Sequence, residues 1–389
     1  MKKRINSLIL SLLMLLSLIS PALAQDTVSS SFISNDIKNQ MLRLLVFTEA
    51  EKENYGLSNV NFSSVYLGSE IPTYQVSNGA LVPADIRLIP ITDGKRLLNM
   101  FCIATTEDGT PFVQLSNDLI DPLSKYVQNE AFAIIYDSDG VYTYANGKLH
   151  LLGLKTLSSI PAEELFHNST SHSTEITIVD TSSETDVVSM VGNECFSELA
   201  IRSCTAPTTV LNASSFADSI SPSSPREVTS AFLDVPIMQQ PAGTHICWAI
   251  SLTSILNYMN NTTWNYSVIH QLFNGGVDAP LSTINLVSLL NVHFDAYWGY
   301  SHTATLSPSR ILSFLRADSP LYGSFETATG GHAVVIRGVS TTLRAFSVMN
   351  PTPTTTRYTT GTFSSNDTLS FISLYNGNTY TLQAYAYPS

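Results

Sequence analysis

The sequence predicts an α+β fold, in which a helical half precedes an antiparallel sheet half behind a mixed, strand-rich N-terminal region. Two observations support this. The charge of the chain changes near residue 226, and beyond that point apolar residues follow helical spacing first and strand patterns afterwards. The chain has 389 residues, 44% hydrophobic and 13% charged, which excludes a disordered chain, a coiled coil and a charge-patterned scaffold.

The first 24 residues have the pattern of a signal peptide. Lys2, Lys3 and Arg4 give a positive start, Leu8–Ile19 is an apolar run, and small residues precede a cleavage position after Ala24. The apolar run is too short for a comfortable membrane span. We therefore predict a secreted protein, cleaved near Ala24, that has no stable association with a membrane.

The charge distribution predicts the domain organisation. Of the formal net charge of −12, residues 25–225 carry 10 positive and 24 negative side chains. An acidic chain without basic stretches argues against nucleic acid as a partner. We expect an acidic N-terminal unit over 25–205 and a second unit over 229–389. Between them, residues 206–228 are rich in Ser, Thr and Pro, which predicts a linker with a processing site.

The N-terminal unit is expected to contain more strand than helix. Asn35–Phe47 has helical spacing, whereas Ala131–Tyr136 and Val141–Tyr144 flank a turn and predict a hairpin. Three histidines of this unit lack the spacing of metal ligands and are expected to be surface or core residues: His150, His167 and His172.

The second unit is expected to form helices first and strands afterwards. One helix should begin at Cys247, another should span Leu281–Leu290, and a third should begin at Pro308 with Ser307 as its N-cap. The expected strands all follow Pro320 and are Leu321–Glu326, His332–Val339, Arg344–Met349, Thr368–Leu374 and Thr379–Tyr387. This order predicts a cleft between the helical half and the sheet half.

The four cysteines have different surroundings. Cys195 and Cys204 are nine residues apart, a spacing that allows a disulfide closing a small loop but does not decide whether it forms. Cys102 lies in an apolar run that predicts a buried thiol. Cys247 lies at the predicted start of a long helix. A helix N-terminus together with an imidazolium lowers the pKa of a thiol, so Cys247 is a candidate nucleophile.

The other groups that such a nucleophile needs come from the sheet half and from the preceding loop. His332 opens a strand after two glycines, and Asn350 ends the next strand before a proline. Antiparallel pairing of these strands would bring the two side chains together, with Asn350 orienting the imidazole. Gln239 or Gln240, shortly before Cys247, can offer an amide donor to a developing oxyanion.

The ordered set of these motifs resembles papain-like cysteine peptidases, and is similar to compact bacterial secreted forms such as staphopains and AvrRpt2-like peptidases. The motifs are Gln239–Ala249, Gly331–Val335 and Met349–Pro351, and the likeness covers about 229–389. The resemblance implies that Gln240 donates to the oxyanion, Cys247 attacks, His332 transfers the proton and Asn350 orients the histidine. It implies no metal and no organic cofactor.

The sequence departs from the papain pattern in three places. His332 follows Cys247 by 85 residues, a gap that fits only shortened members. Gln240 precedes the cysteine by seven residues and Gln239 by eight, instead of the usual six, so the choice between them stays open. The usual glycine before the cysteine is missing.

Other histidines compete for the role of base. His245 lies two residues before Cys247, where it is expected to line the cleft. His270, His293 and His302 lack the glycine–strand context of His332.

The combined expectation is a secreted cysteine peptidase made as a zymogen. It would hydrolyse polypeptide substrates through a thioester at Cys247, with its own N-terminal unit as intramolecular inhibitor. Two alternatives stay open: a Cys-His peptidoglycan amidase or endopeptidase, and a catalytically idle secreted binding module.

Overall fold

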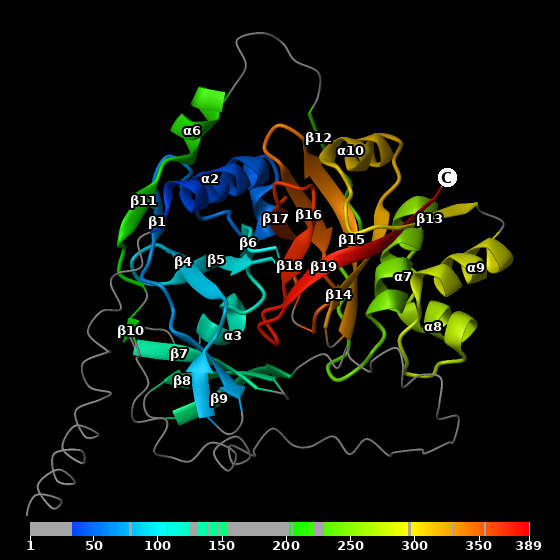
Figure 1. Cartoon of the computed structure of the whole chain (residues 1–389), viewed down its shortest axis with the longest axis horizontal. Helices are drawn as coiled ribbons and strands as arrows, with labels where there is room; N and C mark the ends of the chain where they lie inside the picture. The colour runs from blue at the N-terminus through cyan, green and yellow to red at the C-terminus, as the bar shows by residue number, and fades with distance from the viewer. Residues whose placement is uncertain are drawn as a thin grey trace, which may run out of the picture. The chain divides into compact units, whose positions relative to one another are not determined.

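The computed structural model describes residues 33–77, 80–106, 108–124, 131–137, 140–145, 148–154, 202–203, 205–220, 229–294, 297–328, 330–353 and 355–388 (Figure 1). The predicted signal peptide, the Cys195–Cys204 pair, His167 and His172 lie outside the described residues. Contacts between residues group Ile37–Ser389 into one compact unit. None of the helices in the described ranges combines the length and apolarity needed to cross a membrane.

The predicted α+β class is confirmed, because helices accompany large antiparallel sheets. The helices are α2 (Asn35–Glu49), η1 (Lys52–Tyr55), α3 (Ile120–Ser124), α6 (Ala213–Ile220), α7 (Cys247–Asn260), α8 (Tyr266–Asn274), α9 (Thr283–His293) and α10 (Pro308–Arg316). The strands before residue 212 are β1 (Val65–Leu67), β2 (Thr73–Ser77), β3 (Ala80–Pro83), β4 (Arg87–Thr92), β5 (Leu97–Thr105), β6 (Pro111–Ser116), β7 (Ala131–Tyr136), β8 (Gly140–Ala145), β9 (Lys148–Leu154), β10 (Arg202–Ser203) and β11 (Thr209–Leu211). Those after residue 229 are β12 (Ser230–Phe232), β13 (Trp298–His302), β14 (Leu321–Thr327), β15 (Gly330–Ser340), β16 (Ala345–Met349), β17 (Thr359–Thr362), β18 (Ser370–Ile372) and β19 (Thr379–Pro388).

One large sheet includes strands from both regions of the chain. Its order is β11-β1-β4-β5-β6-β17-β16-β15-β14-β19-β13, with β12 paired to β15 and β18 paired to β19. The connection between the regions is the antiparallel pair β6–β17, where Leu115 faces Thr360 and Gln114 faces Gly361. The domain boundaries at 205 and 229 stay a prediction, and the structure adds that the two regions share a sheet.

A smaller sheet of order β3-β2-β7-β8-β9, with β10 on β7, lies in the N-terminal region. Apolar side chains of both sheets form one buried cluster, which contains Met100 of β5 and Phe132 of β7. Leu374 and Tyr375, which follow β18 near the C-terminus, belong to the same cluster and are fully buried. The C-terminal end of the chain therefore completes the core of the N-terminal region.

Helices α7 and α10 of the C-terminal region pack against β15, while α8 packs on α7 and α9 packs on β13 and β19 (Figure 1). Local sequence sets their boundaries. Ser307 caps α10 by accepting a hydrogen bond from the backbone N–H of Arg310, as its Ser-Pro start predicts. Asn265 caps α8 in the same way through the backbone N–H of Ser267. Helix α7 ends at Asn260, and its C-cap residue Asn261 adopts the left-handed conformation that asparagine tolerates better than most residues.

Most of the expected elements are present with small changes in their ends. The helix predicted over Asn35–Phe47 is α2, and the hairpin predicted around residue 138 is the pair β7–β8. All five strands predicted after Pro320 exist, as β14, β15, β16, β18 and β19. Helix α8 and strands β12, β13 and β17 were not expected.

The stretch predicted as a linker contains secondary structure over part of its length. Strand β11 pairs with β1, Leu211 opposite Val65, because its alternating residues fit an edge of the large sheet. Helix α6 follows directly, after Asn212 accepts a hydrogen bond of 2.8 Å from the backbone N–H of Ser215. Residues 221–228 lie outside the described ranges.

Candidate active site

The first turn of α7 holds Cys247. A turn precedes the helix, and Gly243 adopts φ +72°, a conformation that favours glycine. Trp248 is buried just after the cysteine, and its indole Nε1 donates a hydrogen bond of 3.0 Å to the carbonyl of Ala279. This bond fixes the start of the helix against the chain that follows α8, and so fixes the direction of Cys247.

Helix α7 packs directly on β15, the strand that carries His332. Ser251 lies one turn after Cys247, on the same face of the helix, and its hydroxyl donates a hydrogen bond of 3.0 Å to the carbonyl of Ala333. The backbone of Ala333 also hydrogen-bonds the Cys247 sulfur. The residue next to His332 therefore contacts both Cys247 and the next turn of its helix.

His332 and Asn350 meet as the strand pattern predicted. Strands β15 and β16 pair antiparallel, with Val335 opposite Met349, so Asn350 arrives beside the first residues of β15. The imidazole Nε2 lies 2.7 Å from Asn350 Oδ1. Because an amide oxygen only accepts, Nε2 carries the proton, and the other ring nitrogen, Nδ1, is the acceptor in the neutral imidazole.

Burial governs the protonation of the site. His332 and Cys247 are 6% and 7% exposed. Burial raises the pKa of Cys247 to about 11, although backbone hydrogen bonds from Ala333 and Trp248 oppose the rise. Burial also lowers the pKa of His332 to about 4, opposed by the hydrogen bond to Asn350. The expectation of a thiol with a lowered pKa therefore does not describe this state, in which both groups are neutral at pH 7.

The two glutamines before the cysteine have different partners. Gln240 is buried, and its Nε2 donates to the carbonyl of Thr244, three residues before Cys247, while its buried Oε1 has no hydrogen-bond partner within the described part of the chain. Gln239 instead donates from Nε2 to the carbonyl of Thr355, 2.9 Å away. Only Gln240 has its amide directed into the turn that precedes the nucleophile.

His245 forms a separate pair with Asp278. The carboxylate accepts a hydrogen bond of 2.6 Å from the backbone N–H of His245, and its other oxygen lies 3.5 Å from the ring Nδ1. Asp278 is close enough to Cys247 to oppose ionisation of the thiol. No local pattern in the sequence indicated Asp278. It follows α8 in the chain, and only tertiary packing places it beside His245.

The remaining candidate histidines have contacts of their own. His270 Nε2 lies 2.8 Å from the carbonyl of Val277, His293 stacks on Phe273 and His302 Nδ1 lies 3.2 Å from the hydroxyl of Tyr300. Among the described residues, no group of three or more His, Cys, Asp or Glu side chains is placed to hold a metal ion.

Two aromatic rings close the site on the side of the C-terminal hairpin. The ring of His332 lies 5.6 Å from that of Phe371 on β18 and 6.1 Å from that of Tyr380 on β19. These contacts were not predicted, because no local pattern indicates that the β18–β19 hairpin folds back over the histidine. Ser251 was missed too, although its spacing of four residues from Cys247 was a readable signal.

Residues 229–367 match the family model described as papain-like cysteine protease AvrRpt2. The match includes Cys247, His332 and Asn350, and it confirms the resemblance that the motifs indicated. It supports a cysteine peptidase activity for this part of the chain. A search of curated proteins found no match.

Proposed function

We propose that the chain is a secreted cysteine peptidase, made as a latent precursor, with Cys247 as nucleophile and His332 as general acid and base. The observation that carries this proposal is the hydrogen bond between His332 and Asn350 on the strand that packs against the start of α7. The hydrogen bond orients the imidazole, and the packing of its strand on α7 brings it to the thiol at the start of that helix. Thiol peptidases need this arrangement.

The first half of the reaction forms an acyl-enzyme. Nδ1 of His332 takes the thiol proton, and the Cys247 sulfur attacks the carbonyl carbon of the peptide bond. His332 then gives this proton to the nitrogen of the departing amine, the C–N bond breaks, and a thioester remains on Cys247. Asn350 keeps Nε2 as the protonated nitrogen, so that Nδ1 is available to accept.

The second half restores the thiol. His332 takes a proton from water, the hydroxide attacks the thioester carbonyl, and the C–S bond breaks to release a carboxylic acid. The proton returns to the sulfur. Gln240 is the proposed amide donor to the oxyanion in both halves, which requires its Nε2 to leave the carbonyl of Thr244.

Burial of the site supports the proposal of latency. With a pKa of about 11 for Cys247 and about 4 for His332, the reactive thiolate–imidazolium pair is unfavourable in this state. Phe371, which contacts His332, immediately precedes Ile372, whose backbone is held by a buried Gln114 of the N-terminal region. In this way the N-terminal region acts as an internal inhibitor, because it holds the hairpin over the histidine in the precursor. A cut between the regions would let the hairpin shift away from His332 without requiring the two regions to separate.

Export is proposed from the N-terminal residues alone. These residues have the features of a signal peptide that directs secretion: a positive start, an apolar run and small residues ending at Ala24. The proposal therefore includes removal of about the first 24 residues before the protein folds outside the cell.

The test is a digest of a peptide library by the processed protein, run beside the Cys247→Ala protein. Cleavage of peptide bonds by the first and not by the second supports the proposal. Cleavage of peptidoglycan cross-bridges without cleavage of library peptides would favour the amidase. A Cys247 thiol that stays inert to an active-site alkylator after processing would favour the idle binding module.

A further inference from the structure

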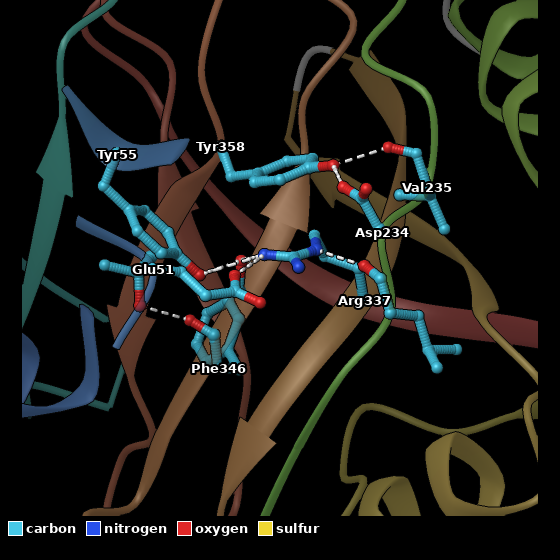
Figure 2. Close-up of polar contacts among 10 residues, drawn as sticks. Glu51, Tyr55, Asp234, Val235, Arg337, Phe346 and Tyr358 are labelled. Atoms are coloured by element: carbon cyan, nitrogen blue, oxygen red, sulfur yellow. Dashed lines mark hydrogen bonds and ion pairs between the residues drawn. The ribbon is translucent and has the colours of Figure 1, made fainter. Parts of the chain in front are cut away.

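A buried arginine connects the two regions of the chain. The side chain of Arg337 on β15 is 0% exposed, and its Nη1 donates to Glu51 Oε2 at 2.9 Å and to the hydroxyl of Tyr55 at 3.1 Å (Figure 2). Glu51 and Tyr55 belong to the N-terminal region, just after α2. An arginine keeps its charge in a protein, so the Glu51 carboxylate is the group that balances it in this buried position.

The other contacts of Arg337 lie in the peptidase segment. Its Nε donates a hydrogen bond of 2.6 Å to the carbonyl of Leu233, and its guanidinium lies 3.8 Å from the centre of the Tyr358 ring (Figure 2). The hydroxyl of Tyr358 in turn donates to the carbonyl of Val235 at 2.6 Å. Arg337 thus joins the N-terminal region to the start of the segment that carries the site and to the stretch that follows Asn350.

Tyr358 ends the loop that begins at Asn350, which we call the Asn350 loop (residues 350–353 and 355–358). The backbone N–H of Tyr358 donates to the carbonyl of Asn54 in the N-terminal region, 3.0 Å away. Within the loop, the hydroxyl of Thr355 donates to the carbonyl of Asn350 at 2.7 Å. The position of Asn350, and through it that of His332, therefore depends on contacts with the N-terminal region.

The β6–β17 pair and the shared core extend this interface. Gln114 is fully buried, and its side-chain amide both donates to the carbonyl of Ile372 at 2.9 Å and accepts from its N–H at 2.7 Å. Leu374 and Tyr375 are buried among side chains of the N-terminal region. Departure of that region would expose these apolar side chains and leave the backbone groups of Ile372 and β17 without partners.

We propose that the N-terminal region is a permanent part of the active peptidase. It stays bound after the chain is cut, and Glu51, acting through Arg337 and Tyr358, is a positioning residue for Asn350. This proposal rests on the proposed function in one respect: it assumes that the precursor is cleaved between the two regions. It differs from release of an inhibitory segment, because the N-terminal region that holds the hairpin near His332 through Gln114 also holds the Asn350 loop in place, through Glu51 and the carbonyl of Asn54.

The first experiment tests association without any need for activity. A recognition sequence for a site-specific protease is inserted between Ser224 and Pro225 of the full chain that carries Cys247→Ala, and the added protease cuts there. The two pieces should elute as one species, at the size of the uncut chain, in native gel filtration and separate only in denaturant. Two separate species in native buffer would overturn the proposal.

The second experiment tests positioning with a matched pair of variants in the processed, active protein. Glu51→Gln removes the charge beside Arg337, while Glu49→Gln removes an equal charge from an exposed residue at the end of α2. We expect Glu51→Gln to lower kcat roughly tenfold with little change in KM, because a displaced Asn350 loop misplaces the imidazole, and Glu49→Gln to change neither. The acid limb of the pH–rate profile, which reports His332, should shift only in Glu51→Gln.

Equal kcat and equal pH profiles for the two variants would reject the positioning role, even if Glu51→Gln melted at a lower temperature. The two proposals fail separately. A wild-type protein that cleaves no peptides would refute the peptidase function, while the gel-filtration result would still decide whether the N-terminal region stays bound.

Discussion

The hydroxyl of Ser251 donates a hydrogen bond to the carbonyl of Ala333, and this contact ties the helix of Cys247 to the strand of His332. Both residues are buried. Ala333 directly follows His332, and Ser251 lies one helical turn after Cys247, so the distance between thiol and imidazole depends on the packing of α7 on β15.

Replacing Cys247 with Ala should abolish peptide hydrolysis, because no other described thiol lies near His332. Cys102→Ala should keep the activity, since Cys102 lies on β5 in the core of the N-terminal region. It should lower the free energy of unfolding by about 1–2 kcal/mol, through the loss of a buried sulfur. Rates with a fluorogenic peptide and a denaturant melt measure both effects, and substantial hydrolysis by Cys247→Ala would refute the mechanism.

His332→Ala should reduce kcat by about 10²–10⁴-fold, because proton transfer to the leaving amine is lost. Asn350→Ala should retain more activity, since the imidazole is still present but no longer held by the 2.7 Å hydrogen bond. His245→Ala serves as the comparison, because its ring faces Asp278. If it proved as damaging as His332→Ala, the assignment of the base would be in doubt.

Alkylation of Cys247 should report the state of the site. The thiolate is the reactive form, and burial raises the pKa of Cys247 to about 11 in the full-length chain. The alkylation rate of the precursor should therefore rise with pH up to and beyond pH 10. After processing, the rate should already be high near pH 7, because an exposed site loses the cost of desolvation. Identical pH profiles before and after processing would contradict latency through burial.

The stability of the folded chain should fall in acid because of His332. Its pKa is about 4 when folded, compared with 6.5 ordinarily, so between these values the unfolded chain binds the proton more strongly. This contribution to stability is fully present above pH 6.5 and is lost as the pH falls towards 4. The loss is at most about 3.5 kcal/mol, at about 1.4 kcal/mol per pKa unit.

The measurement is the free energy of unfolding at pH 6.5 and at pH 4.5 for the wild type and for His332→Gln. The variant should lose less stability than the wild type over this range. Asp118 titrates in the same range with the opposite sign, because burial raises its pKa to about 6, but it contributes equally to both proteins. Equal losses in the two proteins would show that His332 is not protected from protonation.

Processing should occur between the two regions. Residues 209–211 are paired in β11, so the expected cut lies after α6, within or next to 221–228. No lysine follows Lys155, and a lysine-specific protease therefore cannot make this boundary. Mass spectrometry of secreted protein should give a mature N-terminus within or next to residues 221–228, whereas one well inside residues 25–190 would refute the zymogen proposal. If processing is autocatalytic, the Cys247→Ala precursor should stay full length when incubated alone.

The contacts of the site that the sequence predicted are those with local signals. Cys247 begins a helix that has apolar spacing, His332 lies near the start of β15 just after two glycines, and Asn350 directly follows β16 and precedes a proline. Antiparallel pairing of neighbouring strands then suffices to bring His332 and Asn350 together.

The features that the sequence did not predict depend on contacts between distant residues. Leu115 of β6 pairs with Thr360 of β17, and Arg337 pairs with Glu51, across hundreds of residues. Neither pair has a local pattern: β17 is a short run of Thr and Gly, and a lone arginine in a strand is more often exposed than buried. Asp278 and Tyr380 reach the site by the same kind of long-range packing.

The β6–β17 pairing also has a consequence for how the chain folds. Val113 and Thr362 are hydrogen-bonded although 249 residues separate them, and pairing of such distant segments is slow to form. During synthesis β6 is complete long before β17 exists. The edge of β6 therefore stays unpaired until β17 is made, and β17 then pairs with it. A C-terminal segment produced alone would have β17 as a bare sheet edge, which invites aggregation. Recombinant production of an active enzyme should therefore begin from the whole precursor.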